Sequence, residues 1–583
     1  MDWNPGDSRP AVARTVDELW REILDREAVG PTDDFFVIGG NSLGAVKFLA
    51  ELENAFGVDV LTPEELYRAP TFAAIVAAIE ANVRRDGGFP DRPVGELVAR
   101  CAAAVPEAVA LRFRGRAVTY RELDRAANAF AWRLQEERVR PGTVIGVAMA
   151  RTPEFVVALL GILKAGGAYL PIDPAWPAAR LARMVELASA PIVVKDAVTQ
   201  PALPGHVTDL RFDEIDAAGR DDAPHVDVDP RGPAVVNFTS GSTGEPKGVL
   251  IPHRGITSLL HSADFLSLSA DVVLLQHMSP SFDGMTVELW GPLLHGGTCV
   301  LFDGTFPSTG RLRAAINDNG VNTLTLTTAL FNVIVDSAPD LLEPLSALVI
   351  AGEPQSPRHV RAARERLPRL SITNAYGPTE TTVVATAFPI AHLAPDATSV
   401  PIGRAITHRE VAILGPDLAS VAPGEPGEIC VSGPGLAIGY AGRPDLTADR
   451  FVTVELDGEP RRVYRTGDLG RLTPSGDIEF LGRADRQVKI NGHRVELAEV
   501  EHALLAHPGI HQAVAIVHGE SVARSLKAAV IAPGGVPDDL RDTLAATLPD
   551  YMIPADVRAV DAFPLTTNGK VDRVTLTELF DQS

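Results

Sequence analysis

The stretch 237–248 (NFTSGSTGEPKG) gathers glycines, hydroxyl side chains and one lysine, a combination that suits a phosphate ligand. Gly241, Gly244 and Gly248 allow positive φ angles, so that successive backbone N–H groups can converge on an anion. The hydroxyl groups of Ser240, Ser242 and Thr243 add hydrogen-bond donors, and Lys247 adds a positive charge. The stretch therefore predicts a phosphate-binding loop.

The spacing in this loop differs from that of the Walker A loop. A Walker A loop needs a Gly-Lys-Ser/Thr triplet, whereas here Pro246 precedes Lys247 and Gly248 follows it. A flexible Gly/Ser surface loop is the alternative, but such linkers rarely carry a lysine and run directly into an apolar stretch such as 249–251. We therefore expect a phosphate loop that does not belong to a P-loop NTPase.

A second stretch that could carry chemistry is 33–43 (DDFFVIGGNSL), in which Ser42 follows two glycines and precedes an expected helix. Taken alone, Ser42 is interpreted as a helix N-cap, because a serine oxygen accepts a hydrogen bond from the free N–H groups of the first turn. A covalently modified serine is the other interpretation.

Six motifs give these stretches a context. In their residues and order they resemble the amino-acid adenylation domain of a nonribosomal peptide synthetase, a branch of the adenylate-forming enzymes. The motifs are 118–123 (VTYREL), 163–174 (LKAGGAYLPIDP), 374–380 (NAYGPTE), 464–469 (YRTGDL), 482–501 and 568–573 (NGKVDR).

The resemblance implies roles in binding ATP and Mg²⁺. Tyr376 is expected to stack on adenine, and Asp468 to accept hydrogen bonds from both ribose hydroxyls. Glu380 is expected to help hold Mg²⁺ through carboxylate oxygens, and Lys570 to bridge the substrate carboxylate and the α-phosphate. The implied catalytic residues are Lys570, Lys247 and Glu380, and the implied nucleotide ligands are Thr239, Ser240, Gly241, Ser242, Thr243, Gly244, Tyr376, Gly377 and Asp468.

The resemblance also implies a substrate pocket. Asp283 is expected to pair with the α-ammonium of an amino acid, and the other positions are small and uncharged, so a charged side chain would lack a counter-ion. Val287 stands where a phenylalanine pocket often has Trp, which favours a large or substituted aromatic, with a large aliphatic as the alternative. The implied lining is Asp283, Gly284, Val287, Thr325, Val349, Ala351, Ala375, Val383 and Val384, closed by Lys570.

Residues 33–43 resemble the attachment site of peptidyl carrier domains, although Asn41 stands where the family more often has His or Asp. The resemblance implies that Ser42 carries 4′-phosphopantetheine, whose thiol takes the aminoacyl group from the adenylate as a thioester with release of AMP. It also implies a rotation of a C-terminal subdomain about Asp485 between the two half-reactions.

Composition limits the remaining possibilities. The chain has 583 residues, 45% of them hydrophobic, so more than one core is expected. Its net charge of −22 argues against nucleic acid or an anionic membrane as main partner. Cys101, Cys299 and Cys430 have neither disulfide-framework nor zinc spacing. We expect a cytoplasmic, reduced protein without a signal peptide or a membrane span.

The patterns predict a multidomain fold. Helical periodicity in residues 1–83 predicts a small all-α four-helix carrier bundle, and 84–93 is expected to be a linker. Alternating strand and helix patterns in 94–483 predict an α/β adenylation core with two parallel-sheet subdomains. After residue 411 the patterns predict an antiparallel sheet or a β-barrel-like part, and a hairpin at 470–482. Residues 484–583 are expected to form a small, mobile α+β subdomain.

The expected partners follow from these resemblances. They are an amino-acid substrate, a phosphopantetheinyl transferase and a downstream condensation, tailoring or transferase enzyme, and the need for a small MbtH-like activator protein stays open. An acyl- or aryl-CoA ligase is one alternative, but it needs neither a fused carrier nor an acid at Asp283. A non-catalytic carrier or docking protein is another, but it does not explain Lys247, Glu380 and Lys570 together.

Overall fold

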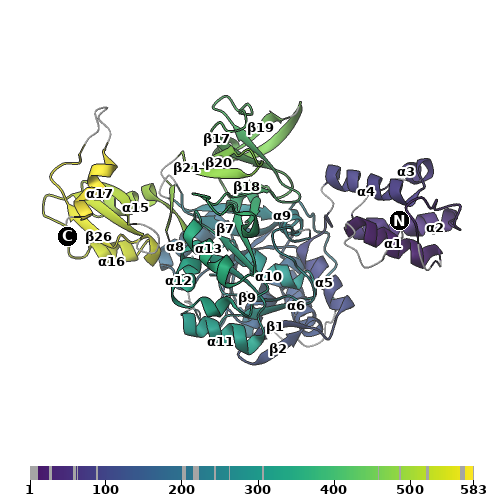
Figure 1. Cartoon of the computed structure of the whole chain (residues 1–583). Coiled ribbons are helices and arrows are strands. Elements are labelled where there is room, and N and C mark those ends of the chain that lie inside the picture. Colours follow the sequence, from purple (N-terminus) through teal and green to yellow (C-terminus); the bar gives the residue numbers. More distant parts are fainter. Residues whose placement is uncertain are drawn as a thin grey trace. The chain divides into compact units, whose positions relative to one another are not determined.

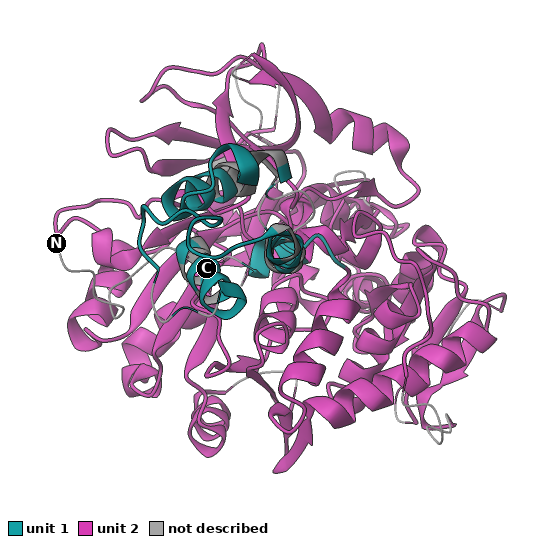
Figure 2. Ribbon diagram, turned by 90° about the vertical axis from the view of Figure 1, so that its right-hand side faces the viewer, with its two compact units in different colours: residues 1–92, 257–262 teal, residues 93–256, 263–583 magenta. Residues whose placement is uncertain are grey.

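The computed structural model describes residues 11–581 apart from 25, 27–28, 57–60, 62, 87–88, 198, 200–204, 215–221, 242–244, 262, 305–307, 457, 485–486, 491, 520–523 and 565–570. The chain divides into two compact units, drawn in different colours in Figure 2. The N-terminal unit comprises 1–92 with 257–262, and the large unit comprises 93–256 with 263–583. No helix among the described residues is long and apolar enough to cross a membrane.

The N-terminal unit is helical, as the periodicity predicts. Val16 and Trp20 lie one turn apart on the first helix and are fully buried, which is the spacing of an amphipathic helix. The Trp20 ring meets Phe35 edge-on at a centroid distance of 5.3 Å and Phe72 at 5.5 Å, so aromatic rings fill the centre of the bundle. Its helices are α1 (Ala11–Leu24), α2 (Ser42–Phe56), α3 (Pro63–Arg68) and α4 (Phe72–Asp86).

The start of α2 differs from the N-cap interpretation of Ser42. Asn41 is the capping residue, because its Oδ1 accepts a hydrogen bond of 2.9 Å from the Gly44 N–H. Ser42 is therefore the first helical residue and is not needed as the cap. The preceding glycine is sterically required, since a Cβ on Gly40 would come within 2.4 Å of the Phe35 ring and carbonyl oxygen.

Two large sheets form the centre of the large unit, and both are parallel in their interior. The first has nine strands in the order β15-β14-β13-β12-β11-β9-β10-β1-β2, with antiparallel pairs at its two edges. The predicted alternation of strands and helices is confirmed here. Its strands are β1 (Val109–Phe113), β2 (Arg116–Thr119), β9 (Val273–Gln276), β10 (Thr298–Leu301), β11 (Thr323–Thr327), β12 (Ala347–Ala351), β13 (Ser371–Tyr376), β14 (Thr386–Pro389) and β15 (Arg404–Ala405).

The second sheet has seven strands in the order β18-β8-β7-β4-β3-β5-β6. Strand β5 is buried along its whole length, as expected for a strand covered on both faces. The predicted phosphate loop joins β7 to β8, which pair in antiparallel fashion up to Thr239 and Lys247. The strands are β3 (Val144–Ala148), β4 (Ala168–Pro171), β5 (Ile192–Lys195), β6 (Thr208–Arg211), β7 (Pro233–Thr239), β8 (Lys247–Pro252) and β18 (Gly439–Tyr440).

Helices connect and cover these strands, as labelled in Figure 1. Several begin at the carboxyl end of a strand, where an α/β fold places its ligands. They are α5 (Val94–Ala104), α6 (Tyr120–Glu136), α7 (Pro153–Lys164), α8 (Ala178–Leu187), α9 (His253–Leu260), α10 (Met285–Leu293), α11 (Thr309–Asn319), α12 (Thr328–Ser337), α13 (Pro357–Arg366) and α14 (Pro444–Arg450).

The predicted β-barrel-like part is an open antiparallel sheet in the described residues. Its path is β16-β17-β20-β19, and β21 pairs with β20 to form the predicted hairpin around 470–482. The long strand β20 pairs with β17, β19 and β21, and its register with β21 shifts between Leu469 and Gly470, as at a β-bulge. The strands are β16 (Glu410–Leu414), β17 (Gly427–Ser432), β19 (Phe451–Leu456), β20 (Glu459–Leu472) and β21 (Ile478–Arg483).

The C-terminal part is small and α+β, as predicted. It begins with a separate two-stranded hairpin, β22 with β23, and continues into a three-stranded sheet, β24-β25-β26. Its elements are β22 (Gln487–Ile490), β23 (His493–Glu496), α15 (Leu497–Leu505), β24 (Gln512–His518), β25 (Ser525–Ile531), α16 (Leu540–Ala545), β26 (Asp556–Ala559) and α17 (Arg573–Asp581).

Candidate active site

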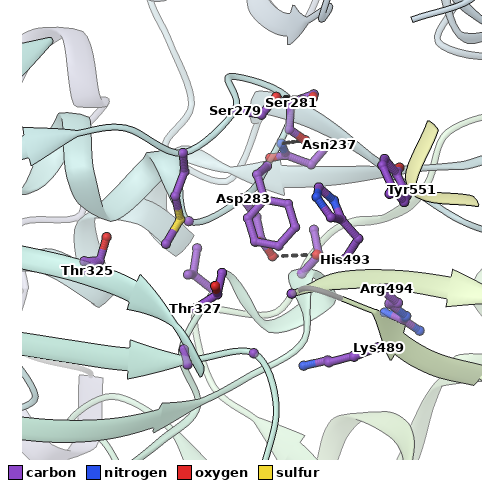
Figure 3. Close-up of a pocket in the computed structure, with 18 of the residues that line it drawn as sticks. Asn237, Ser279, Ser281, Asp283, Thr325, Thr327, Lys489, His493, Arg494 and Tyr551 are labelled. Carbon is purple, nitrogen blue, oxygen red and sulfur yellow. Dashed lines mark hydrogen bonds between the residues drawn. The ribbon is translucent and has the colours of Figure 1, made fainter. Parts of the chain in front are cut away.

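A cavity of about 1840 Å³ lies in the large unit. The carboxyl ends of β7, β11, β12 and β13 open into it, as the rule for parallel sheets requires. The β22–β23 hairpin forms another wall, and Figure 3 shows Lys489, His493 and Arg494 of that hairpin on the side of the pocket away from Thr325.

Described residues of the predicted phosphate loop hold carboxylates of the C-terminal part. The Gly241 N–H donates to Glu499 Oε2 at 3.1 Å, and Lys247 Nζ lies 3.5 Å from Glu496 Oε1. The Ser240 hydroxyl donates to the Arg494 carbonyl at 2.8 Å and accepts from the Glu496 N–H at 3.1 Å. The loop therefore presents donors and positive charge to anions, which is the property that phosphate binding needs.

The geometry of this loop requires glycine at one described position. A Cβ on Gly241 would lie 1.6 Å from the Glu245 carbonyl oxygen, so any other residue would force the loop apart. Ser242, Thr243 and Gly244 lie outside the described residues.

The proposed adenosine-binding residues lie close together. The Tyr376 hydroxyl donates to Asp468 Oδ2 at 2.5 Å, and Arg483 donates to the other oxygen of the same carboxylate. Burial, followed by the charge of Asp468, raises the pKa of Tyr376 well above its ordinary value, so the hydroxyl stays a donor. Gly377 follows directly, and a Cβ there would come within 2.5 Å of the Val383 carbonyl oxygen. All four residues Tyr376, Gly377, Asp468 and Arg483 line the cavity.

Glu380 is a fully buried carboxylate with strong partners. The Arg494 guanidinium lies 2.9 Å from Oε2, and the Tyr440 hydroxyl donates to Oε1 at 2.7 Å. Burial alone would raise the pKa of Glu380, but the Arg494 charge and the Tyr440 hydrogen bond lower it to about 2. An ionised carboxylate is the kind of ligand that suits a hard cation such as Mg²⁺, and in this structure it is paired with the Arg494 guanidinium.

All nine residues predicted for the substrate pocket line the cavity: Asp283, Gly284, Val287, Thr325, Val349, Ala351, Ala375, Val383 and Val384. The Asp283 carboxylate accepts a hydrogen bond of 2.5 Å from the Thr379 hydroxyl, and burial raises its pKa. The space that Gly284 leaves is partly filled, because a Cβ there would lie 2.4 Å from the Met278 sulfur. Met278 therefore also shapes the pocket, although the predicted lining contains only smaller residues at this point.

The β22–β23 hairpin brings in residues that the sequence patterns did not assign to the site. Lys489 is half-buried in the cavity wall, and desolvation lowers its pKa, while the charges of Asp468 and Asp283 act against that shift. The His493 ring stacks on Tyr551 with 3.9 Å between centroids and an interplanar angle of 9°. The available signal was the alternating sequence 487–496 with Asn-Gly at its centre, which is typical of a two-residue hairpin turn.

Three further predicted residues are not fully described by the structure. Lys570 and Asp485 lie outside the described residues, and the side chain of Ser42 is not described. Pro564 and Val571 flank the stretch that contains Lys570, and neither of these two lines the cavity. Val571 packs instead with the apolar cluster beneath α17.

Three family models match the chain. The AMP-binding enzyme model matches residues 98–441, the phosphopantetheine attachment site model matches 14–79, and the AMP-binding enzyme C-terminal domain model matches 499–570. The attachment region thus precedes the AMP-binding region.

Sequence relatives of the chain include peptide synthases. The chain is 41% identical to a linear gramicidin synthase protein of Brevibacillus parabrevis over 83% of its own length, and 37% identical to bacitracin synthase 1 of Bacillus licheniformis over 84%. It spans only 6% and 9% of those two proteins.

The chain covers a much larger share of two solved structures. Holo-PA1221, an NRPS protein containing adenylation and PCP domains, is 34% identical with a TM-score of 0.77 over 83% of this chain and 84% of that one. An artificially fused adenylation–PCP didomain from Klebsiella oxytoca, NpsA-ThdA, is 28% identical with a TM-score of 0.75 over 80% and 93%. The chain therefore belongs to the AMP-binding, adenylate-forming ligase family, with a phosphopantetheine attachment region joined to it as in nonribosomal peptide synthetases.

Proposed function

We propose that the chain activates an amino acid with ATP to an aminoacyl adenylate, and then transfers the aminoacyl group to a pantetheine thiol carried by Ser42. The observation that carries this proposal is the shared cavity. Ser240 of the anion-binding loop and Asp283, a half-buried carboxylate suited to an α-ammonium, both line it. The phosphate groups of ATP and the α-ammonium group of the amino acid can thus bind in the same cavity.

In the first half-reaction a substrate carboxylate oxygen attacks the α-phosphorus, and pyrophosphate leaves. Both reactants are anions, so the residues act mainly by positioning and by neutralising charge. Ser240, Gly241 and Lys247 would hold the leaving phosphates, and Asp283 would hold the ammonium. Glu380 would hold Mg²⁺, which supplies further positive charge to the phosphate oxygens when it is bound.

The arrangement in this structure suits the second half-reaction. The Gly241 N–H and Lys247 are engaged by Glu499 and Glu496, so the terminal phosphates of ATP cannot occupy the same donors. The Glu380 carboxylate is likewise engaged by Arg494. We infer that the C-terminal part adopts this position after pyrophosphate has left, and that Lys570 enters the site in the other position, by rotation about Asp485.

The substrate class follows from the pocket. Apart from Asp283 the implied lining is uncharged, and Val287, Val349 and Val384 are apolar and buried. We propose an aromatic or large hydrophobic amino acid, since an ionic side chain would be buried there at a cost of several kcal/mol. The product thioester would pass to a condensation, tailoring or transferase enzyme, after a phosphopantetheinyl transferase has modified Ser42.

The test is pyrophosphate exchange into ATP, driven by a panel of amino acids and amine-free carboxylic acids. Wild-type protein should respond to aromatic or large hydrophobic amino acids. Asp283→Asn keeps the size of the side chain but removes its charge, and it should weaken all α-amino acids together. Strongest exchange with an amine-free acid, or an Asp283→Asn variant with unchanged exchange, would contradict the proposed function.

A further inference from the structure

We infer that the side-chain pocket selects an aromatic amino acid whose ring carries an N–H or O–H donor, such as an indole or a phenol, and that Thr325 accepts the hydrogen bond from that donor. The inference rests on the proposed function and specifies its substrate. Its basis is the hydrogen-bond network behind Thr325, which determines the direction in which this hydroxyl can bond.

Strand β11 places Thr325 at the cavity. Side chains alternate along a strand, and the neighbours Leu324 and Leu326 are fully buried in the apolar core on the opposite face. Thr325 and Thr327 both face the cavity, and Figure 3 shows Thr325 farther from Lys489 and His493 than Thr327 is. Thr325 therefore lies in the part of the pocket remote from the β22–β23 hairpin.

The hydroxyl proton of Thr325 is committed to a buried carboxylate. Thr325 Oγ1 lies 2.6 Å from Glu288 Oε1, and Glu288 has no exposed surface. The other oxygen, Oε2, accepts hydrogen bonds from the Gln276 side-chain amide at 3.2 Å and from the backbone N–H groups of His277 and Met278 at 3.1 and 3.0 Å. All three partners of Oε2 are N–H donors, so the Glu288 side chain acts as an acceptor toward them and toward the Thr325 hydroxyl.

The His277 ring is a second possible donor near the Thr325 hydroxyl, but its proton is also used elsewhere. The His277 Nε2 lies 2.7 Å from the Thr325 carbonyl oxygen, which is an acceptor, so this nitrogen carries its proton toward the backbone. The Thr325 hydroxyl, having given its one proton to Glu288, presents only lone pairs to the pocket.

The Thr325 oxygen is a hydrogen-bond acceptor that faces the pocket, and it favours a ligand that can donate a hydrogen bond to it. A substrate without a donor would leave this oxygen desolvated and unpaired, and sites built in this way discriminate strongly against analogues that lack the matching group. The surrounding walls restrict the donor to a neutral group on an apolar side chain, because Val287, Val349 and Val384 are apolar and buried. Ring N–H and O–H groups meet both requirements.

The experiment compares matched pairs of substrates in pyrophosphate exchange with the full chain. L-Tryptophan is paired with 3-benzothienyl-L-alanine, in which sulfur replaces the indole N–H, and L-tyrosine is paired with L-phenylalanine. For at least one pair the wild-type ratio of kcat/KM, donor over partner, should be at least about tenfold. The ratio is internal to each protein sample, so it does not depend on the folded fraction.

Two variants locate the effect. Thr325→Val has the same shape without the oxygen and should bring the ratio to near one, whereas Thr325→Ser keeps the oxygen and should retain the preference. Ratios near one in the wild type, or strongest exchange with ornithine or lysine, would overturn the inference while leaving amino-acid activation intact. Exchange driven only by amine-free acids would instead overturn the proposed function itself.

Discussion

The pair of Arg180 and Glu499 offers a direct test of the arrangement assigned to the transfer half-reaction. The Arg180 Nη1 lies 2.7 Å from Glu499 Oε1, and the two side chains are 5% and 3% exposed. Glu499 also accepts from the Gly241 N–H at 3.1 Å. One carboxylate thus joins helix α8, the phosphate loop and the C-terminal part, and it does so only while the C-terminal part is in this position.

Glu499→Gln removes the charge but keeps the size of the side chain. Breaking a buried ion pair by removing one partner commonly costs about 3–5 kcal/mol, and a factor of ten corresponds to about 1.4 kcal/mol. If the arrangement shown is the one that transfers the aminoacyl group, its population should fall by roughly 100-fold or more. Transfer to Ser42, measured as covalent loading of labelled amino acid in single turnover, should slow by that factor, and pyrophosphate exchange should change by less than about threefold.

Two controls separate this effect from general damage. Glu578→Gln, at an exposed position on α17 of the same C-terminal part, should leave both half-reactions unchanged. Arg180→Gln combined with Glu499→Gln removes the uncompensated charge and should recover part of the lost transfer rate. Equal losses of exchange and loading in the Glu499→Gln variant would refute the assignment of this arrangement to transfer.

Further predictions concern the covalent arm, the two half-reactions and the pocket. Ser42→Ala should abolish covalent loading and leave pyrophosphate exchange intact, and undiminished loading would rule out this attachment site. Lys570→Ala should lower exchange by roughly 100-fold or more, since one electrostatic contact to a transition state is worth about 2.7–4 kcal/mol. Asp485→Pro should slow loading more than exchange because proline restricts φ at the hinge, and equal slowing would contradict a hinge role. Val287→Trp should shift the exchange preference toward smaller side chains, and an unchanged preference profile would remove Val287 from the pocket floor.

Much of the fold could be predicted because the relevant signals are local. The buried run at β5 and the glycine-rich loop between β7 and β8 follow from side-chain type and spacing over a few residues. The hairpin of β20 and β21 was likewise marked by its turn residues, 474–477. For the part after residue 411 the sequence left an antiparallel sheet or a barrel open, because closure depends on which distant strands pair, and strand periodicity does not determine that.

The site was harder to predict where it depends on contacts between distant segments. Capping by Asn41 instead of Ser42 depends on where helix α2 begins, and a shift of one residue changes which side chain reaches the free N–H. Met278 fills space beside Gly284 because its flexible side chain bends over the start of α10. Lys489 reaches the cavity only through the position of the C-terminal part, which a local pattern cannot give.

The carboxylates on the phosphate loop have a consequence for control by metabolite levels. Glu496 and Glu499 bind the donors that pyrophosphate would use, so these two carboxylates compete with pyrophosphate for one site. A high pyrophosphate concentration would therefore hold back thioester output even when adenylate is abundant, although pyrophosphate is not a reactant in that step. An enzyme that hydrolyses pyrophosphate would therefore accelerate thioester formation. The balance between pyrophosphate release and pyrophosphate hydrolysis would set how quickly each loaded carrier becomes available.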